Sequence, residues 1–122
     1  MNKTPKLTGF AAEMRDFALA LPEATEEFPW GERAFKVAKK AFVFLRAENE
    51  ISFSVKLPKS AVQALALPFA SPTHYGLGKH GWVTFVLPRR LSAVLRKQCL
   101  DWILESYVSV APKRVSAKLS SG

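Results

Sequence analysis

Apolar and polar residues alternate with a period of two through the middle of the chain, a pattern typical of half-buried β-strands. The clearest case is 51–57, in which apolar residues alternate with Ser52, Ser54 and Lys56. The apolar run at 82–87 is nearly continuous and predicts a strand in the interior of the sheet. A short edge strand is predicted inside 23–31. Four longer strands follow it, at 34–37, 41–46, 51–57 and 82–87.

Two short links indicate how these strands pair. Lys39 and Lys40 join the first two of the longer strands, and 48–50 joins the second to the third. Connections this short usually join antiparallel neighbours through hairpins. We therefore expect an antiparallel meander sheet of about five strands.

Residues at both ends of the chain follow the period of an amphipathic helix. The first apolar stripe begins after Thr8, whose side chain suits a helix N-cap, and ends before Pro22. A short helix is predicted at 60–67. The longest stripe consists of Leu91, Val94, Leu95, Cys99, Trp102, Ile103, Tyr107 and Val110. This order of elements predicts the α+β class, with N-terminal and C-terminal helices packed on one face of the sheet.

The length of 122 residues fits one domain, which we place at 1–122 with a tail at 115–122 that frays. No apolar run approaches the roughly 20 residues that span a bilayer. The basic N-terminus is followed by charged residues, where a signal peptide needs an apolar stretch. The single cysteine, Cys99, excludes an internal disulfide. We expect a cytoplasmic monomer that does not enter the membrane.

The net charge of +8 comes entirely from the second half of the chain. Residues 1–55 hold eight Lys/Arg and eight Asp/Glu, whereas 56–122 hold ten Lys/Arg against Asp101 and Glu105. Such an excess favours an anionic partner, although it carries no information about the fold. A basic surface that interacts only with water would have the same composition.

Residue types that perform catalysis or bind metals are present without the arrangement that this chemistry needs. His74 and His80 are separated by a glycine-containing loop, and no Asp, Glu or Cys lies between Glu50 and Cys99. Cys99 falls on an apolar helix stripe, which predicts a buried packing role. Further carboxylates lie in a turn-rich segment, at Glu23, Glu26, Glu27 and Glu32. We therefore expect no enzyme activity, no metal and no cofactor.

The segment 71–87 contains both histidines of the chain and three of its glycines. Residues 76–81, Gly-Leu-Gly-Lys-His-Gly, offer glycines and a lysine as phosphate-binding loops do. The Walker spacing is absent, however, and a strand follows where a helix should begin. The segment therefore predicts an exposed cationic loop anchored by the strand at 82–87.

Several short motifs occur together along nearly the whole chain. They are Leu21-Pro22-Glu23-Ala24-Thr25-Glu26-Glu27, Pro29-Trp30-Gly31, Ala34-Phe35-Lys36-Val37, Lys40-Ala41-Phe42, Ser54-Val55-Lys56-Leu57, Tyr75-Gly76-Leu77-Gly78-Lys79-His80-Gly81-Trp82-Val83, Glu105-Ser106-Tyr107 and Ala111-Pro112-Lys113-Arg114. In this combination the chain resembles the MmcQ/YjbR family, small bacterial proteins usually described as DNA-binding.

The resemblance implies an antiparallel sheet flanked by helices, similar to the frataxin/CyaY-like architecture, and contact with DNA. The matching positions that it singles out are Trp30, Gly31, Lys36, Lys56, Tyr75, Lys79, His80 and Trp82. Both tryptophans are equally suited to core packing, the commoner role of an aromatic side chain. The first helix lacks the acidic ridge of a frataxin-like iron binder, so iron delivery is not expected.

Basic residues near the ends of predicted elements favour non-specific DNA binding through backbone phosphates. The candidate contacts are Lys36, Lys39, Lys40, Lys56, Lys79, His80, Arg89 and Arg90, with Tyr75 as an auxiliary contact. No recognition-helix or zinc-finger pattern accompanies them, so no reading of base sequence is predicted.

A small-ligand or protein-interaction module is the alternative function. Its groove would lie between the 71–82 loop and the sheet. The expected lining is Trp30, Tyr75 and Trp82, with Lys56, Lys79 and His80 binding an anionic group.

Overall fold

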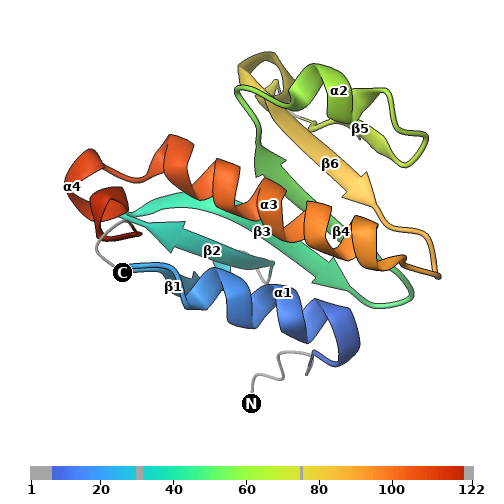
Figure 1. Ribbon diagram of the computed structural model, residues 1–122, viewed down its shortest axis with the longest axis horizontal. Helices are drawn as coiled ribbons and strands as arrows, with labels where there is room; N and C mark the ends of the chain where they lie inside the picture. Colours follow the sequence, from blue (N-terminus) through green and yellow to red (C-terminus); the bar gives the residue numbers. More distant parts are fainter. Residues whose placement is uncertain (1–6, 30–31, 75, 120–122) are drawn as a thin grey trace.

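The computed structural model describes residues 7–29, 32–74 and 76–119 (Figure 1). Along the chain the elements are α1 (Gly9–Leu19), β1 (Thr25–Glu27), β2 (Arg33–Val37), β3 (Lys40–Ala47), β4 (Ile51–Lys56), α2 (Ala61–Leu65), β5 (Ala70–Pro72), the 3₁₀ helix η2 (Leu77–His80), β6 (Trp82–Val86), α3 (Ala93–Val110), α4 (Lys113–Ser116) and the 3₁₀ helix η3 (Ala117–Leu119). This confirms the predicted α+β class.

One antiparallel sheet contains every strand of the described residues, in the order β1-β2-β3-β4-β6-β5. It has six strands rather than about five, because 70–72 forms β5 where no strand was predicted. β5 pairs with β6 from Ala70–Phe85 to Pro72–Val83. The extra strand therefore depends on its neighbour for hydrogen bonds, and its own sequence shows no alternation.

The helices α1 and α3 cover the same face of the sheet, as predicted (Figure 1). Their buried side chains meet those of the sheet in one core. At its centre the Trp102 ring of α3 stacks on Phe85 of β6, with ring centroids 4.1 Å apart and an interplanar angle of 12°. Tyr107 packs edge-on against Phe42 and donates a hydrogen bond to the Pro22 carbonyl at 2.6 Å. Burial of these aromatic side chains fixes α3 across the strands.

Several details at the helix ends differ from the sequence prediction. Thr8 occupies the N-cap position of α1 without a side-chain capping bond. Ser92 caps α3 instead, since its hydroxyl accepts from the Leu95 amide at 3.0 Å. Val94, placed on the apolar stripe by its spacing, is 80% exposed. Val115 is fully buried in α4, so the tail that we expected to fray from 115 is anchored at its first residue.

A register shift in β3 changes how the middle of the sheet is built. Phe35 pairs with Val43, but the next residue of β2, Lys36, pairs with Ala41. Phe42 is thus an extra residue in β3, as in a β-bulge, and both Phe42 and Val43 are buried. The bulge directs two neighbouring side chains of β3 into the core.

The Ser106 hydroxyl of α3 is inserted where the β3–β4 ladder ends. The ladder stops at Val43–Val55. Beyond it, the Lys56 amide donates to Ser106 Oγ at 2.8 Å, and this hydroxyl donates to the Phe42 carbonyl at 2.6 Å. Ser106 is fully buried. A helix side chain therefore replaces the direct bond between the two strands and satisfies both backbone groups.

Substitution Ser106→Ala removes both of these hydrogen bonds. The Phe42 carbonyl and the Lys56 amide then lose their partner, and we expect the free energy of unfolding to fall by about 2–3 kcal/mol. Chemical denaturation followed by circular dichroism measures this change. Ser109→Ala is the matched control, because Ser109 is exposed and bonds only to a carbonyl at the helix end. Equal stability of the two variants would show that the inserted hydroxyl does not hold the strands.

Candidate nucleic-acid interface

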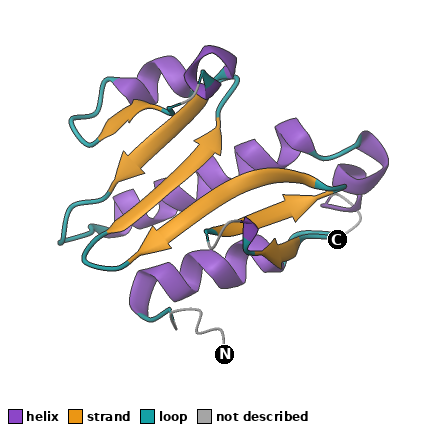
Figure 2. Ribbon diagram, turned by 180° about the vertical axis from the view of Figure 1, so that it is seen from behind, coloured by secondary structure: helices purple, strands orange, loops and turns teal. Residues whose placement is uncertain are grey.

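The sheet divides into two parts at the end where β3 begins and β4 ends. There Lys40 and Ala41 pair only with β2, while Lys56 pairs with Trp82 of β6. Figure 2 shows the β2–β3 pair diverging from the β4–β6 pair, with α3 behind the opening between them. The last turn of α3 lies at this opening because Ser106 joins it to both strands.

A hollow of about 250 Å³, here called the β3–β4 hollow, lies at this division. Its lining residues are Lys40, Ala41, Lys56, Trp82, Ser109 and Val110. Two lysines and an indole N–H supply hydrogen-bond donors, and none of the described lining residues carries a carboxylate. The Ser109 hydroxyl donates to the Ser106 carbonyl at 2.9 Å. The hollow is suited to an anion rather than to a cation.

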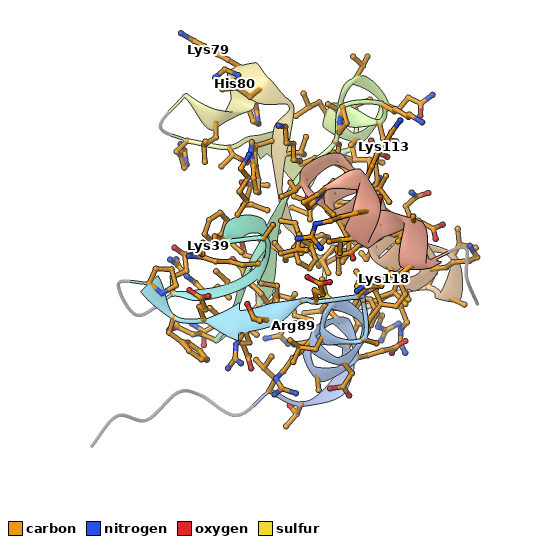
Figure 3. All side chains as sticks on the ribbon, turned by 90° about the vertical axis from the view of Figure 1, so that its left-hand side faces the viewer. Lys39, Lys79, His80, Arg89, Lys113 and Lys118 are labelled. Atoms are coloured by element: carbon orange, nitrogen blue, oxygen red, sulfur yellow. The ribbon has the colours of Figure 1, made fainter. Side chains whose placement is uncertain are left out.

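Further basic side chains lie at the same end of the sheet as the hollow, in the β2–β3 turn, in η2 and at the start of α4, and we call this group together with the two lysines of the hollow the basic end. Its members are Lys39, Lys40, Lys56, Lys79, His80 and Lys113. Figure 3 looks onto this end, with Lys79 and His80 at the top, Lys39 on the left and Lys113 on the right. The β2–β3 turn that carries Lys39 has positive φ at Ala38 (51°) and at Lys39 (69°), as a type I′ hairpin requires.

Two carboxylates of β1 and of the residues before it are paired with basic side chains outside the basic end. Glu27 pairs with Lys36 at 3.2 Å. Glu23 binds Lys118 at 2.7 Å, which lowers the pKa of its carboxyl through that hydrogen bond and the charge of the lysine. Within the part of the chain that the structure describes, no carboxylate lies within 4.0 Å of a charged group of the basic end. Lys36, although predicted as a contact, is neutralised and is therefore not included.

Arg89 and Arg90 lie at the opposite end of the sheet. They follow β6, whose last residue pairs with Ser52 near the start of β4. The turn between β3 and β4 at that end carries Glu48 and Glu50, both exposed. The structure therefore does not bring these arginines together with the lysines of the predicted DNA surface.

Several amides of the described part of the glycine loop are already bonded to carbonyls of the same segment. Gly78 donates to the Thr73 carbonyl at 3.1 Å, Lys79 to Gly76 at 3.2 Å, and Gly81 to Gly78 at 3.2 Å. Gly76 and Gly81 have φ of 78° and 86°, values that favour glycine. The glycines thus shape the turn into β6, and the side chains of Lys79 and His80 are what the loop exposes.

The described residues include part of the groove of the alternative function. Two of its predicted lining residues, Trp30 and Tyr75, lie outside the described residues. Trp82 is 8% exposed and packs against Phe44, with ring centroids 5.7 Å apart. It lines the β3–β4 hollow with Lys56, as expected. Lys79 and His80 do not line this hollow; Lys40 does.

Other features offer less for binding an anion. A larger hollow of about 410 Å³ lies between α2 and α3, and its described lining is neutral and mostly apolar. Among the described residues no group of three or more His, Cys, Asp or Glu could hold a metal ion. None of the described helices is long and apolar enough to cross a membrane.

Lys113 is a member of the basic end that the sequence did not single out. It begins α4, which follows the end of α3 that lines the β3–β4 hollow. The sequence signal was present, since Lys113 follows a proline that ends the long helix. Its position at this end depends on the direction in which α3 crosses the sheet, which residue spacing alone does not define.

These observations define a small α+β protein with a six-stranded antiparallel sheet in its described residues, helices α1 and α3 on one face and a cationic end. Residues 19–109 match the YjbR family, and the chain belongs to this family. The resemblance inferred from the motifs is thereby confirmed. No curated protein matches the chain.

A crystal structure of a protein from Pseudomonas syringae has a similar fold, with a TM-score of 0.63. The two chains are 19% identical, and the similarity covers 90% of this chain and 99% of the other. At this level of identity the likeness concerns the fold alone.

The buried thiol of Cys99 provides a test of the packing role predicted for it. Burial raises the pKa of Cys99 to about 12, and the residue is fully buried in α3. Because the thiolate is the reactive form, we expect the Cys99 thiol of the folded protein not to react with Ellman's reagent at about pH 8. In concentrated guanidinium chloride the thiol should react fully. Rapid labelling of the folded protein would show that the helix is not packed as described.

Proposed function

We propose that this protein binds DNA without sequence specificity, through the backbone phosphates and by means of its basic end. The observation that supports this proposal is the clustering of six cationic or titratable side chains at one end, without carboxylate partners among the described residues. Lysines that are not held by ion pairs can neutralise phosphates and release the counterions bound to them. Such binding should weaken steeply as salt is added.

The shape of the basic end supports backbone contact rather than reading of bases. Its cations come from the hairpin turn, the ends of strands, η2 and the first residue of α4. Lysine is a flexible point charge, whereas base recognition in the major groove usually uses a helix or a β-ribbon that places side chains at base edges. The surface is formed within one chain, so the proposal requires no second copy.

A small anionic ligand is the second candidate, and the β3–β4 hollow favours it. The hollow has two lysines and an indole N–H but a volume below the range of about 300–1,000 Å³ common for drug-sized ligands. It could therefore hold one anionic group rather than a large molecule. Nucleic acid remains the first candidate because the cations extend well beyond the hollow.

A salt titration of binding to a generic DNA duplex tests the proposal. The triple variant Lys39→Gln/Lys40→Gln/Lys56→Gln removes three cations of the basic end. If each contacts one phosphate, the slope of log affinity against log salt should decrease in magnitude by about 2.7. Fluorescence anisotropy over a range of salt concentrations measures both slopes.

The matched control removes the same charge from the opposite end. In Arg46→Gln/Arg89→Gln/Arg90→Gln the net charge falls equally, but we expect the slope to stay close to that of the wild type. Equal losses in the two triple variants would indicate attraction by net charge alone. Affinity that does not respond to salt, or the absence of binding at low salt, would rule out the proposal.

A further inference from the structure

We propose that the β3–β4 hollow binds the terminal phosphate monoester of a nucleic-acid strand. This inference rests on the proposed function, because the rest of the strand would lie over the basic end. It assigns to the hollow a ligand class that is distinct from the internal phosphodiesters of the backbone. Three features carry it: the position of the hollow, its charge and its hydrogen-bond donors.

The position of the hollow suits the end of a strand. It opens between the first residues of β3 and the last residue of β4, and Ser109 and Val110 of α3 line it from the helix side. An internal phosphate is flanked by two sugars and must be contacted from a surface. A terminal phosphate has a sugar on only one side, so it can enter a recess while the strand remains outside.

The charge of the hollow matches a dianion. Lys40 and Lys56 contribute two positive charges, and neither has a carboxylate within 4.0 Å among the described residues. The α3 helix ends at Val110 beside them, and a helix C-terminus carries about half a negative charge. The sum is about +1.5, compared with about −1.5 to −2 for a phosphate monoester near neutral pH. An internal phosphodiester carries a single negative charge and would leave the lysines incompletely neutralised.

The hollow also offers more hydrogen-bond donors than the two unesterified oxygens of one internal phosphate can accept from fully. Each lysine ammonium can donate three hydrogen bonds, and an indole such as that of Trp82 can donate one. Phosphate monoesters offer three terminal oxygens, whereas a phosphodiester offers two unesterified ones. The backbone amide of Lys56 is bonded to Ser106 Oγ, which fixes the end of β4 from which the lysine side chain extends.

Paired duplexes test this inference directly. Two short blunt duplexes of the same sequence differ only in carrying 5′-phosphate or 5′-hydroxyl ends. A third, hydroxyl-ended duplex is lengthened until its total charge equals that of the phosphorylated one. Charge-assisted hydrogen bonds to the terminal group should make the phosphorylated duplex bind about tenfold more tightly than either control at equal ionic strength. Anisotropy measures all three affinities.

Single lysine variants locate the effect. Lys40→Gln and Lys56→Gln should each abolish most of the preference for the phosphorylated duplex, because either change leaves the hollow with little net positive charge. Lys39→Gln is the matched control, since Lys39 is the neighbouring lysine of the same turn but does not line the hollow. It should weaken binding of all three duplexes by a similar factor and preserve the preference.

The outcomes separate this inference from the proposed function. Equal binding of the phosphorylated and charge-matched duplexes would overturn the inference and leave DNA binding in place. No binding of any duplex would overturn both. If inorganic phosphate or thymidine 5′-monophosphate binds as tightly as the phosphorylated duplex and is equally sensitive to Lys56→Gln, the hollow takes a free phosphate compound and the strand-end assignment is wrong. A preference that survives both Lys40→Gln and Lys56→Gln would place the site elsewhere.

Discussion

The buried hydroxyl of Ser106 connects the fold to the candidate site. It accepts from the Lys56 amide and donates to the Phe42 carbonyl, and so replaces the bond that would otherwise continue the β3–β4 ladder. The separation of the two strands and the position of the last turn of α3 follow from this arrangement, which lies next to the bulge at Phe42. Without it the strands could pair further and close the hollow. One helix residue thus keeps an opening in an otherwise continuous sheet.

The carboxylates of the chain are used in ways that leave the basic end positive. Glu26 binds Arg15 and Arg33 beneath α1, whereas Glu105 accepts from the amides of Lys59 and Ser60 at the start of α2. These contacts have structural roles, since they satisfy a nearly buried guanidinium and two backbone donors. A carboxylate engaged in this way is not available to neutralise lysines elsewhere. The five lysines of the basic end have no carboxylate within 4.0 Å among the described residues.

Periodicity in the sequence predicted the elements whose pattern is set by burial on one side. The alternation of 51–57 and the apolar run of 82–87 led to β4 and β6 because those residues face the core. β5 was missed because its backbone bonds to β6 stabilise it without an apolar pattern. The role of Ser106 was equally hidden, since a serine in a helix resembles any other polar position. The separation of β3 from β4, and with it the hollow, depends on the hydrogen bonds of Ser106 to Lys56 and Phe42, which are 50 and 64 positions away in the sequence.

The distance between the basic end and the arginines that follow β6 limits how they can act together. Each of β4 and β6 spans five or six residues, and a strand rises about 3.3 Å per residue, so the lysines and Arg89 are separated by at least roughly 15 Å. This exceeds the screening length of about 8 Å at physiological salt. The field at the hollow therefore comes mainly from Lys40, Lys56 and their immediate neighbours. A ligand that senses the total charge of the protein would not distinguish the ends, whereas one that enters the hollow would respond to those lysines alone.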